Sequence, residues 1–405
     1  MTKKPTSTAS RRRFLAGAAA TTGLVAASSF VPTRFAIGAK APIKVGILLP
    51  YSGTYAMLGN SITDALKLRI AEAGGKLGGR DVDWVAIDSE WTPAKAPIKS
   101  QQLVNKEKVD FVVGPVHSGI AMGMSTVLRP RKTPIWIIPN AGNDLLTGKL
   151  CAPHVFRTSF SNWQSAHVGG KLMADDGIKT CVNITWKYAA GEQMMAAGKA
   201  AFEAAGGKVI EEIWVPFPDV EFQAFLSKIA ALKPDAVFSF YSGGGAIKFV
   251  KDYAAAGLKE SIPLYGPGFL TEGVIKAQGD AAEGIKTALH YADGLNTPAD
   301  NKFRAAYQKA YGRGPNVFSV QGYDTGSLLL QAAAAVGGDI GATANVIEAM
   351  ESATFADSPR GPWKMSAAHN PVQDIYIREA KGGQNLSIGV GAKQLEDPAT
   401  GCKTG

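Results

Sequence analysis

The chain has 405 residues, which is long enough for two domains of ordinary size. Hydrophobic residues make up 46% of it and charged residues 19%, a composition that excludes an intrinsically disordered chain and a coiled coil. The net charge is +9, but residues 1–36 hold six basic residues and no acid, so the rest of the chain carries only +3. No stripe of basic and aromatic residues remains there, which argues against nucleic acid as a partner.

Residues 1–36 have the pattern of an export signal. Three arginines at 11–13 are followed by Phe14-Leu15 and by an Ala-rich apolar stretch that is too short for a stable membrane span. The paired arginines resemble a twin-arginine signal, which carries folded proteins out of the cytoplasm. An uncleaved anchor and a general export signal are the alternatives. No later stretch of the sequence is long and apolar enough to span a bilayer.

The first part of the remaining chain alternates strands with helices. The apolar run at 43–49 is typical of a strand buried on both faces, and an apolar helical pattern at 62–70 is closed by Gly74-Gly75. Further strands are expected near 82–88, 109–114 and 134–138, and further helices near 94–107 and 118–128. This alternation predicts a parallel sheet.

A second strand–helix series comes after a connection at 151–157. Its expected helices lie near 161–176, 189–205, 220–231 and 244–256, and its strands lie near 180–185, 208–214, 235–240 and 262–265. The pattern changes at about residue 289. From there on, two helices are expected near 299–311 and 317–336, and two short strands near 361–364 and 374–378.

These elements divide into two lobes. Lobe one is expected to comprise residues 42–160 plus 289–353, lobe two residues 161–288 plus 354–381, and a loosely held tail residues 382–405. A chain that starts in one lobe, crosses to the other and returns suits a hinge that closes on a ligand.

One sequence pattern occurs twice. Residues 71–76 and 203–208 both end in Ala-Gly-Gly-Lys, and Lys-x-Asp-x-Val occurs at 108–112 and again at 233–237, each time before a Gly/Ser loop. Ligands of open α/β sheets lie outside the carboxyl ends of the strands, so two such lobes would place loops on both walls of a cleft. The alternative is that Ala-Gly-Gly is only a common helix C-cap.

Motifs of catalysis are missing from the sequence. It has no phosphate-binding Gly-x-x-x-x-Gly-Lys-Ser/Thr loop, no His-Glu-x-x-His helix and no Gly-x-Ser-x-Gly elbow. The five histidines are scattered, which argues against a metal cluster: His117, His154, His167, His290 and His369. We therefore expect neither an enzyme nor a cofactor. Gly243-Gly244-Gly245 opens a helix, where it serves either as an anion site or as a structural turn.

The three cysteines form no Cys-x-x-Cys motif. Cys181 has the surroundings of a buried strand residue. Cys151 and Cys402 both lie in polar loop sequence, and a disulfide between them is a hypothesis for an oxidising compartment.

Seven short motifs succeed one another along the chain: Gly46-Ile-Leu-Leu-Pro-Tyr-Ser-Gly-Thr-Tyr, Gly114-Pro-Val-His-Ser-Gly, Pro139-Asn-Ala-Gly, Phe156-Arg-Thr-Ser-Phe, Tyr188-Ala-Ala-Gly, Gly266-Pro-Gly-Phe-Leu and Gly322-Tyr-Asp. Their order and spacing resemble the leucine/isoleucine/valine-binding-like group of type I periplasmic solute-binding proteins of ABC transporters. The resemblance covers nearly all of the chain after the leader. It implies two Rossmann-like lobes with parallel sheets, joined by a three-crossing hinge. It also implies a periplasmic monomer that delivers a small molecule to a membrane permease.

The resemblance further implies which residues contact the ligand: Ser52, Tyr55, His117, Ser118, Gly119, Asn140, Ala141 and Gly142 on lobe one, Tyr188, Tyr241, Ser242, Gly268 and Phe269 on lobe two, and Tyr323 near the hinge. Hydroxyl and backbone N–H donors of residues 117–119 are expected to hold a carboxylate. For the four aromatic residues at 188, 241, 269 and 323, core packing or helix capping is the alternative role.

One departure from the family bears on the ligand. In the amino-acid-binding proteins of the family that this chain resembles, an acidic residue stands at the position of Gly268. That residue neutralises the ammonium group of the ligand. A buried ammonium without a carboxylate partner is unfavourable by several kcal/mol. Together with the small Ala190, this favours an aromatic or branched aliphatic carboxylate. Glu272 and Asp324 are alternative sources of the missing negative charge. Branched-chain amino acids are therefore the alternative class of ligand. A ligand-sensing receptor domain is the other alternative.

Overall fold

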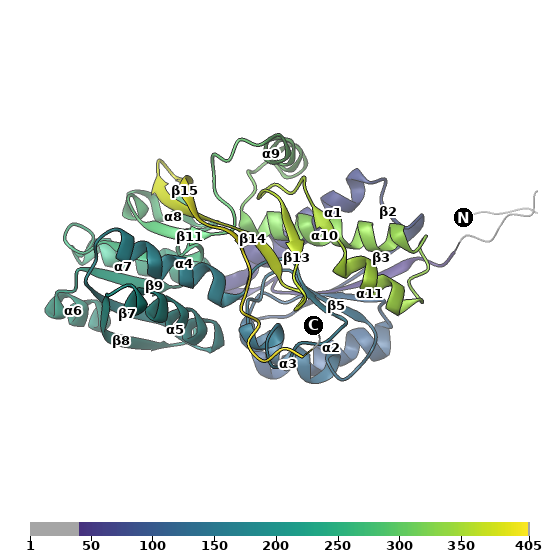
Figure 1. Ribbon diagram of the computed structural model, residues 1–405, viewed down its shortest axis with the longest axis horizontal. Helices are drawn as coiled ribbons and strands as arrows, with labels where there is room; N and C mark the ends of the chain where they lie inside the picture. The colour runs from purple at the N-terminus through teal and green to yellow at the C-terminus, as the bar shows by residue number, and fades with distance from the viewer. Residues whose placement is uncertain (1–39, 404–405) are drawn as a thin grey trace, which may run out of the picture. The chain divides into compact units, whose positions relative to one another are not determined.

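A computed structural model describes residues 40–403, and the predicted export signal at 1–36 lies outside them. Two α/β lobes make up this part of the chain (Figure 1). The chain enters lobe one through β1 (Ile43–Leu49), α1 (Ala56–Glu72), β2 (Lys76–Leu77), β3 (Arg80–Asp88), α2 (Ala96–Gln101), β4 (Phe111–Val113), α3 (Ser118–Leu128), β5 (Ile135–Ile138) and β6 (Val155–Arg157).

Lobe two comes directly after. Its elements are α4 (Asn162–Asp175), β7 (Thr180–Lys187), α5 (Ala189–Ala204), β8 (Lys208–Pro216), α6 (Gln223–Leu232), β9 (Ala236–Phe240), α7 (Gly243–Ala255), β10 (Leu264–Pro267), α8 (Ile275–Gln278) and β11 (Lys286–Leu289). The chain then runs through α9 (Pro298–Tyr311), α10 (Val317–Ala335), α11 (Thr343–Glu351), β12 (Thr354–Phe355), β13 (Trp363–Met365), β14 (Pro371–Lys381) and β15 (Gln384–Leu395). Helix α10 returns to lobe one, where it packs along α1.

The two sheets share one topology. The strand order in lobe one is β2-β3-β1-β4-β5-β6, and in lobe two the order β8-β7-β9-β10-β11 repeats the part from β3 to β6. The neighbouring strands β3, β1, β4, β5 and β6 are parallel, as are β8, β7, β9, β10 and β11. The strand order reverses between β1 and β4 and between β7 and β9, and a ligand of such a sheet lies at this switch point. The prediction of two α/β lobes with parallel sheets is confirmed.

The repeated Lys-x-Asp-x-Val pattern has the same structural role in both lobes. Lys108 and Lys233 each end a helix in the left-handed conformation, with φ of 54° and 47°. The Asp110 carboxylate then accepts from the Lys44 N–H at the start of β1 (2.8 Å), and the Asp235 carboxylate accepts from the Thr180 N–H at the start of β7 (2.7 Å). Each aspartate therefore fixes the register of the two strands at its switch point.

Three segments cross between the lobes: residues 158–161, residues 290–297 and the start of β14. The third crossing corrects the expected boundary at residue 354. The Gln331 amide donates to the Thr354 carbonyl (3.1 Å), and the Arg157 N–H donates to the His369 carbonyl (2.9 Å), so residues 354–370 contact lobe one. Only from about Tyr376 on does β14 pair with β11 of lobe two.

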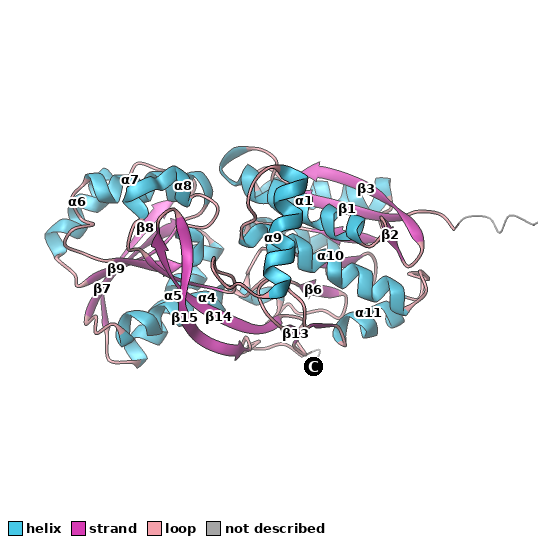
Figure 2. Cartoon of the chain, turned by 90° about the horizontal axis from the view of Figure 1, so that it is seen from above, coloured by secondary structure: helices cyan, strands magenta, loops and turns pink. Residues whose placement is uncertain are grey.

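The segment after residue 382 is also different from the expected loose tail. Residues 384–395 form β15, which pairs antiparallel with β14 along its whole length. Residues 396–403, which we call the C-terminal strap, then leave the sheet and reach lobe one (Figure 2). The strap is a fourth link between the lobes, in addition to the three crossings.

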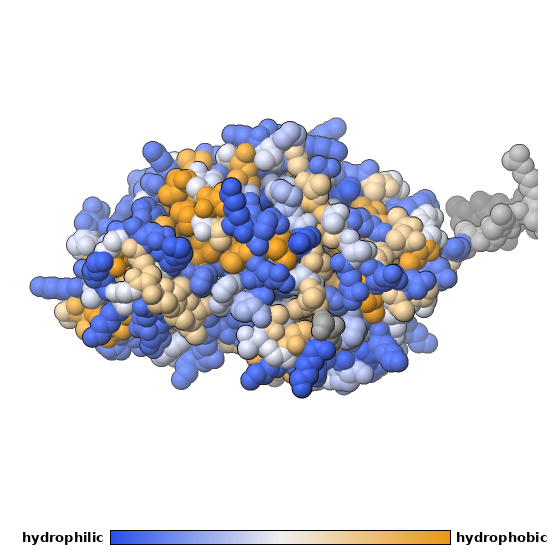
Figure 3. Space-filling model, viewed as in Figure 1, coloured by the Kyte–Doolittle hydropathy of each residue, from blue (hydrophilic) through white to orange (hydrophobic). Residues whose placement is uncertain are grey.

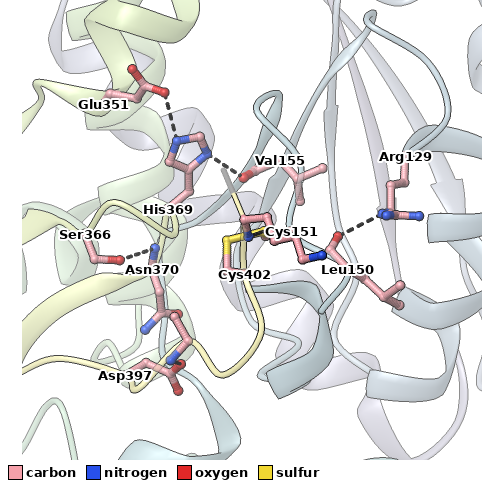
Figure 4. Close-up of a disulfide and its surroundings, with 12 residues drawn as sticks. Arg129, Leu150, Cys151, Val155, Glu351, Ser366, His369, Asn370, Asp397 and Cys402 are labelled. Carbon is pink, nitrogen blue, oxygen red and sulfur yellow. Dashed lines mark hydrogen bonds and ion pairs between the residues drawn. A yellow bond between two sulfur atoms is a disulfide. The ribbon is translucent and has the colours of Figure 1, made fainter. Parts of the chain in front are cut away.

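A disulfide ends the strap. Cys402 is bonded to Cys151, 251 positions earlier in the chain, at the loop before β6 (Figure 4). Beside it, the His369 ring joins the Val155 carbonyl (3.1 Å) to the Glu351 carboxylate (3.0 Å). The strap is therefore fixed both to lobe one and next to the third crossing.

Most of the face seen in Figure 3 is hydrophilic, with a hydrophobic patch around β15. On that strand, Ile388 and Val390 are 51% and 44% exposed. Within residues 40–403, no helix is long and apolar enough to cross a membrane, and no three His, Cys, Asp or Glu side chains are grouped as metal ligands.

We expect removal of the disulfide to destabilise the folded protein. The double variant Cys151→Ser/Cys402→Ser frees a very long loop in the unfolded chain, and native disulfides contribute about 2–4 kcal/mol. Urea unfolding of the variant and of the oxidised wild type measures the difference. The buried Cys181 is left unchanged in both proteins, so the comparison isolates the disulfide. Equal stability of the double variant and the wild type would contradict this assignment.

Candidate functional site

A cavity lies where the first turns of six helices meet. The N-cap residues of these helices are Tyr55 (α1), His117 (α3), Ser161 (α4), Tyr188 (α5), Ser242 (α7) and Asn316 (α10). In both lobes, this is the edge at which the parallel strands end. Each helix N-terminus carries the positive end of the helix dipole, although side chains cap the first N–H groups of α3, α4 and α10. Together they favour a ligand with negative charge.

The cavity is mostly apolar and aromatic. Its empty space, counted together with the part that is open to solvent, amounts to ≈ 320 Å³, and the lining residues are Tyr55, Leu58, Val116, Ser118, Asn140, Gly142, Phe160, Asn162, Tyr188, Ala190, Met194, Phe240, Ser242, Phe269 and Phe318. Among these lining side chains, only Tyr55 and Tyr188 are ionisable, and burial raises the pKa of both above the usual value for tyrosine. The helix N-termini are thus the source of positive potential at the cavity.

His117 caps the helix that begins at Ser118. Its Nδ1 accepts hydrogen bonds from the N–H groups of Gly119 (2.9 Å) and Ile120 (3.2 Å). The ring is therefore neutral, with its proton on Nε2, and burial lowers the pKa of His117 to about 4. It also stacks on Tyr188 of lobe two at 4.6 Å. His117 thus serves the wall of the cavity as a cap and as a stacking partner.

This cap corrects the expected role of Gly119. The Gly119 N–H is occupied by His117, so it is not available to hold a carboxylate. Ser118 remains at the cavity, and its hydroxyl accepts from the Asn162 amide at 3.4 Å, which leaves its own hydrogen to donate. Asn140 also lines the cavity and donates to the Gln321 side chain (2.7 Å).

A buried arginine supports the lobe-one wall from behind. The guanidinium of Arg157 donates to the carbonyls of Gly142 (3.3 Å), Asn143 (2.7 Å) and Phe160 (3.1 Å). Burial lowers the pKa of Arg157 to about 10, although the carboxyls of Asp397 and Asp144 oppose this shift. Burial and the nearby Asp397 raise the pKa of Asp144 to about 7. Asp397 belongs to the C-terminal strap, so the strap contributes to the charge balance behind the cavity.

Aromatic contacts join the two walls. The hydroxyl of Tyr55, on lobe one, lies 3.2 Å from the hydroxyl of Tyr188, on lobe two. Phe217 packs against His117 and Tyr188, each at 4.9 Å. Ser242 completes the lobe-two wall, and its buried hydroxyl has no hydrogen-bond partner within residues 40–403.

Gly268 lies behind this wall, where two other side chains leave no room for a larger residue. A Cβ atom there would be 2.4 Å from Arg378 Nη2 and 2.6 Å from Leu289 Cβ. Arg378 donates to the Gly268 carbonyl (2.7 Å) and forms a buried ion pair with Glu272 (2.5 Å). The space beside Gly268, where the family resemblance led us to look for an acidic partner of a ligand ammonium, is therefore filled by a structural ion pair.

Neither of the acids expected as substitutes is free to meet a ligand ammonium. Glu272 accepts from the Val317 N–H (2.7 Å) in addition to its bond with Arg378. Asp324 pairs with Arg360 at 3.0 Å and accepts from the Ser358 hydroxyl (2.9 Å), while burial raises the pKa of Asp324 to about 6. Both carboxylates act within the protein.

Comparison with known proteins shows the family of this chain. The sequence model of the periplasmic binding protein family matches residues 42–385. The chain belongs to the periplasmic binding protein family. It is 33% identical to Leu/Ile/Val-binding protein homolog 6 of Brucella melitensis over 83% of this chain and 87% of that protein.

Two solved structures are close in fold. A solute-binding protein of an ABC transporter from R. palustris, in complex with benzoate, is 51% identical with a TM-score of 0.87, covering 90% of this chain and 100% of that one. A second, from Rhodopseudomonas palustris BisB5 in complex with 3,4-dihydroxy benzoic acid, is 32% identical with a TM-score of 0.83, covering 88% and 99%. The expected type I architecture with its hinge is confirmed.

This periplasmic binding protein brings together half of the site residues that the sequence suggested. Seven of them line the cavity: Tyr55, Ser118, Asn140, Gly142, Tyr188, Ser242 and Phe269. His117, Gly119 and Ala141 lie directly beside lining residues, and Ala141 is buried with its N–H bonded to the Pro115 carbonyl. The other four do not line the cavity, namely Ser52, Tyr241, Gly268 and Tyr323.

These four have other partners, with Gly268 engaged as described above. Ser52 donates to the Asp88 carboxylate (2.7 Å) and is exposed. Tyr241 is fully buried against Trp186, Phe222 and Phe249 in the core of lobe two. Tyr323 lies within α10 and donates to the Glu72 carboxylate at 2.6 Å. Core packing, the alternative weighed for Tyr241, is the role that its contacts give it.

Sequence reasoning missed much of the apolar lining. Phe160, Phe240 and Phe318 surround the cavity together with Leu58, Val116, Met194 and Asn162. A usable signal was present for Phe160 and Phe240, since each ends a segment that leads into a ligand loop. Leu58 and Phe318 lie in the first turns of α1 and α10, and Met194 lies in the second turn of α5, where an apolar residue has the same pattern as ordinary core.

We expect His117 to make stability depend on pH. Its folded pKa of about 4 is below the unfolded value of roughly 6.5, so the unfolded chain binds more protons. The contribution of His117 to the free energy of unfolding is fully present above pH 6.5 and is lost as the pH falls toward 4. The loss between pH 7 and pH 5 is roughly 2 kcal/mol. The variant His117→Asn keeps a cap acceptor but does not titrate. Urea unfolding at both pH values should therefore show a smaller loss for His117→Asn, and equal losses would refute the assignment.

We also expect Gly268→Ala to destabilise the protein by about 1–3 kcal/mol, because the added methyl group overpacks a site without space. Gly389→Ala, where nothing lies within 4 Å of the new Cβ, is the matched control in the same lobe. Urea unfolding compares the two. Because the same space is filled, Gly268→Asp should gain no affinity for leucine. Leucine binding by this variant in calorimetry would show that the Arg378–Glu272 ion pair moves to make room for the new carboxylate.

Proposed function

We propose that this protein is the exported substrate-binding receptor of an ABC importer. In this proposal it binds a small aromatic carboxylate between its lobes, closes over it and delivers it to a membrane permease from the periplasm as a monomer. The observation that carries the proposal is the cavity itself, which is aromatic, free of charged side chains among the described residues, and placed at six helix N-termini. The twin-arginine route of export belongs to the same proposal.

The carboxylate end of the ligand fits the lobe-one wall. The Ser118 hydroxyl and the second hydrogen of the Asn140 amide are polar donors there, and α3 directs the positive end of its dipole to the same place. Hydrogen bonds from such donors to an ionised carboxylate are about twice as strong as neutral ones. No arginine or lysine is needed for an anion that is held in this way.

The ring of the ligand fits the aromatic side of the cavity. Phe160 and Phe269 lie 4.7 Å apart, and Phe240 meets Phe269 edge-on at 6.1 Å. Rings in these arrangements gain contact energy with another ring. The benzoate bound by the R. palustris protein, which is 51% identical, supports this substrate class.

Binding of branched aliphatic carboxylates is compatible with the same cavity, whereas the case for amino acids is weaker. The name of the 33% identical Brucella protein favours leucine, isoleucine or valine. An amino acid would however bring an ammonium group into a cavity whose nearby acids, Glu272 and Asp324, are already paired. A buried, unpaired ammonium is strongly unfavourable.

We expect isothermal titration calorimetry to detect benzoate or a hydroxybenzoate and not leucine. Ser118→Ala should weaken the binding of the acid by about 10- to 100-fold, the equivalent of one hydrogen bond to a charged group. Ser125→Ala removes a hydroxyl from the same helix, where it bonds only the Met122 carbonyl, and should leave affinity unchanged. Tight leucine binding, or no binding of any aromatic or branched acid, would overturn the proposed substrate class.

A further inference from the structure

Gln193 connects the two lobes next to the cavity. It lies on α5 of lobe two, beside Met194 of the cavity wall, and its amide reaches the loop after β5 of lobe one. Its Oε1 accepts from the Asp144 N–H (3.1 Å), and its Nε2 donates to Asn143 Oδ1 (3.2 Å). Both bonds run from lobe two to lobe one, so opening of the lobes would break them.

Backbone groups fix the direction of these hydrogen bonds. The Leu145 N–H donates to Asn143 Oδ1 (3.0 Å), and a backbone N–H can only donate. Asn143 therefore presents its oxygen, which needs a donor from Gln193. The Asp144 N–H likewise requires the oxygen of Gln193. A glutamine at this position satisfies both demands, and a glutamate would place an oxygen against the oxygen of Asn143.

The same amide also orients the polar wall of the cavity. Gln193 Oε1 accepts from Asn162 Nδ2 at 2.7 Å, and Asn162 Nδ2 lies 3.4 Å from the Ser118 hydroxyl. The Asn162 N–H donates to the Gly142 carbonyl (2.7 Å). Asn162, Ser118 and Gly142 all line the cavity, so the Gln193 side chain takes part both in a contact between the lobes and in the placement of the polar wall.

We propose that Gln193 is a latch: a positioning residue that stabilises the closed lobes around the ligand and slows its release. The proposal rests on the proposed function for the identity of the ligand. Because the latch bonds join the lobes only after closure, they stabilise the closed complex and not the first encounter. Loss of the latch therefore raises the dissociation rate constant and leaves the association rate constant nearly unchanged.

The test is stopped-flow kinetics with benzoate as the probe, on the full protein. Gln193→Ala should release benzoate about 10-fold faster than the wild type, with an association rate constant within about 2-fold, as expected for the loss of two or three net hydrogen bonds. Gln193→Glu, whose side chain has the same shape as glutamine, should release benzoate at least as fast as Gln193→Ala. Glu192→Ala changes the exposed neighbour on the same helix and should behave as the wild type.

Unchanged release from Gln193→Ala would overturn the latch, and so would wild-type release from Gln193→Glu. If the wild type binds neither benzoate nor a hydroxybenzoate, the proposed function fails. The role of Gln193 is then tested by hydrogen exchange of the ligand-free protein. Faster exchange of the backbone N–H groups of residues 143–145 in Gln193→Ala than in the wild type supports it. Equal exchange in the two proteins overturns it.

Discussion

A parallel sheet places the N-termini of its helices at one edge, and this constraint decides where the protein can hold a ligand. Each lobe has the same strand order, so each presents its switch point and its helix dipoles at the end of its central strands. With the two edges facing each other, six first turns surround one cavity. The positive potential there comes from the backbone, which leaves the side chains free to supply an aromatic surface.

The ionised side chains nearest the cavity act on its walls from behind. Arg157 binds the carbonyls of the loop after β5, Arg378 binds the Gly268 carbonyl, and Arg360 binds the carbonyls of Thr158 and Ser159 in the first crossing. Each of these guanidinium groups is buried and has carboxylates nearby. A planar group with five donors can fix several carbonyls at once, which is how a loop of irregular backbone gains a defined shape.

The sequence was sufficient for the elements, the two lobes and the edge at which the site lies, because these depend on periodicity, turn residues and sheet handedness. Tyr55, Ser118 and Tyr188 could be placed at the site from the family resemblance, and each of them comes shortly after a strand. What escaped prediction depends on contacts between distant segments. Nothing local indicates that His117 occupies the Gly119 N–H, that Arg378 fills the space beside Gly268, or that residues 384–395 pair with β14. The same holds for Gln193, whose partners lie about fifty positions away.

The C-terminal strap has a practical consequence for the use of this protein as an optical sensor. The described chain enters at β1 of lobe one, and the bond from Cys402 to Cys151 returns its other end to lobe one. Two fluorophores fused at these ends would both be attached to lobe one, so their separation would change little when the lobes move relative to each other. A reporter pair needs one partner inserted in lobe two, for example at the exposed turn around Gly206 between α5 and β8.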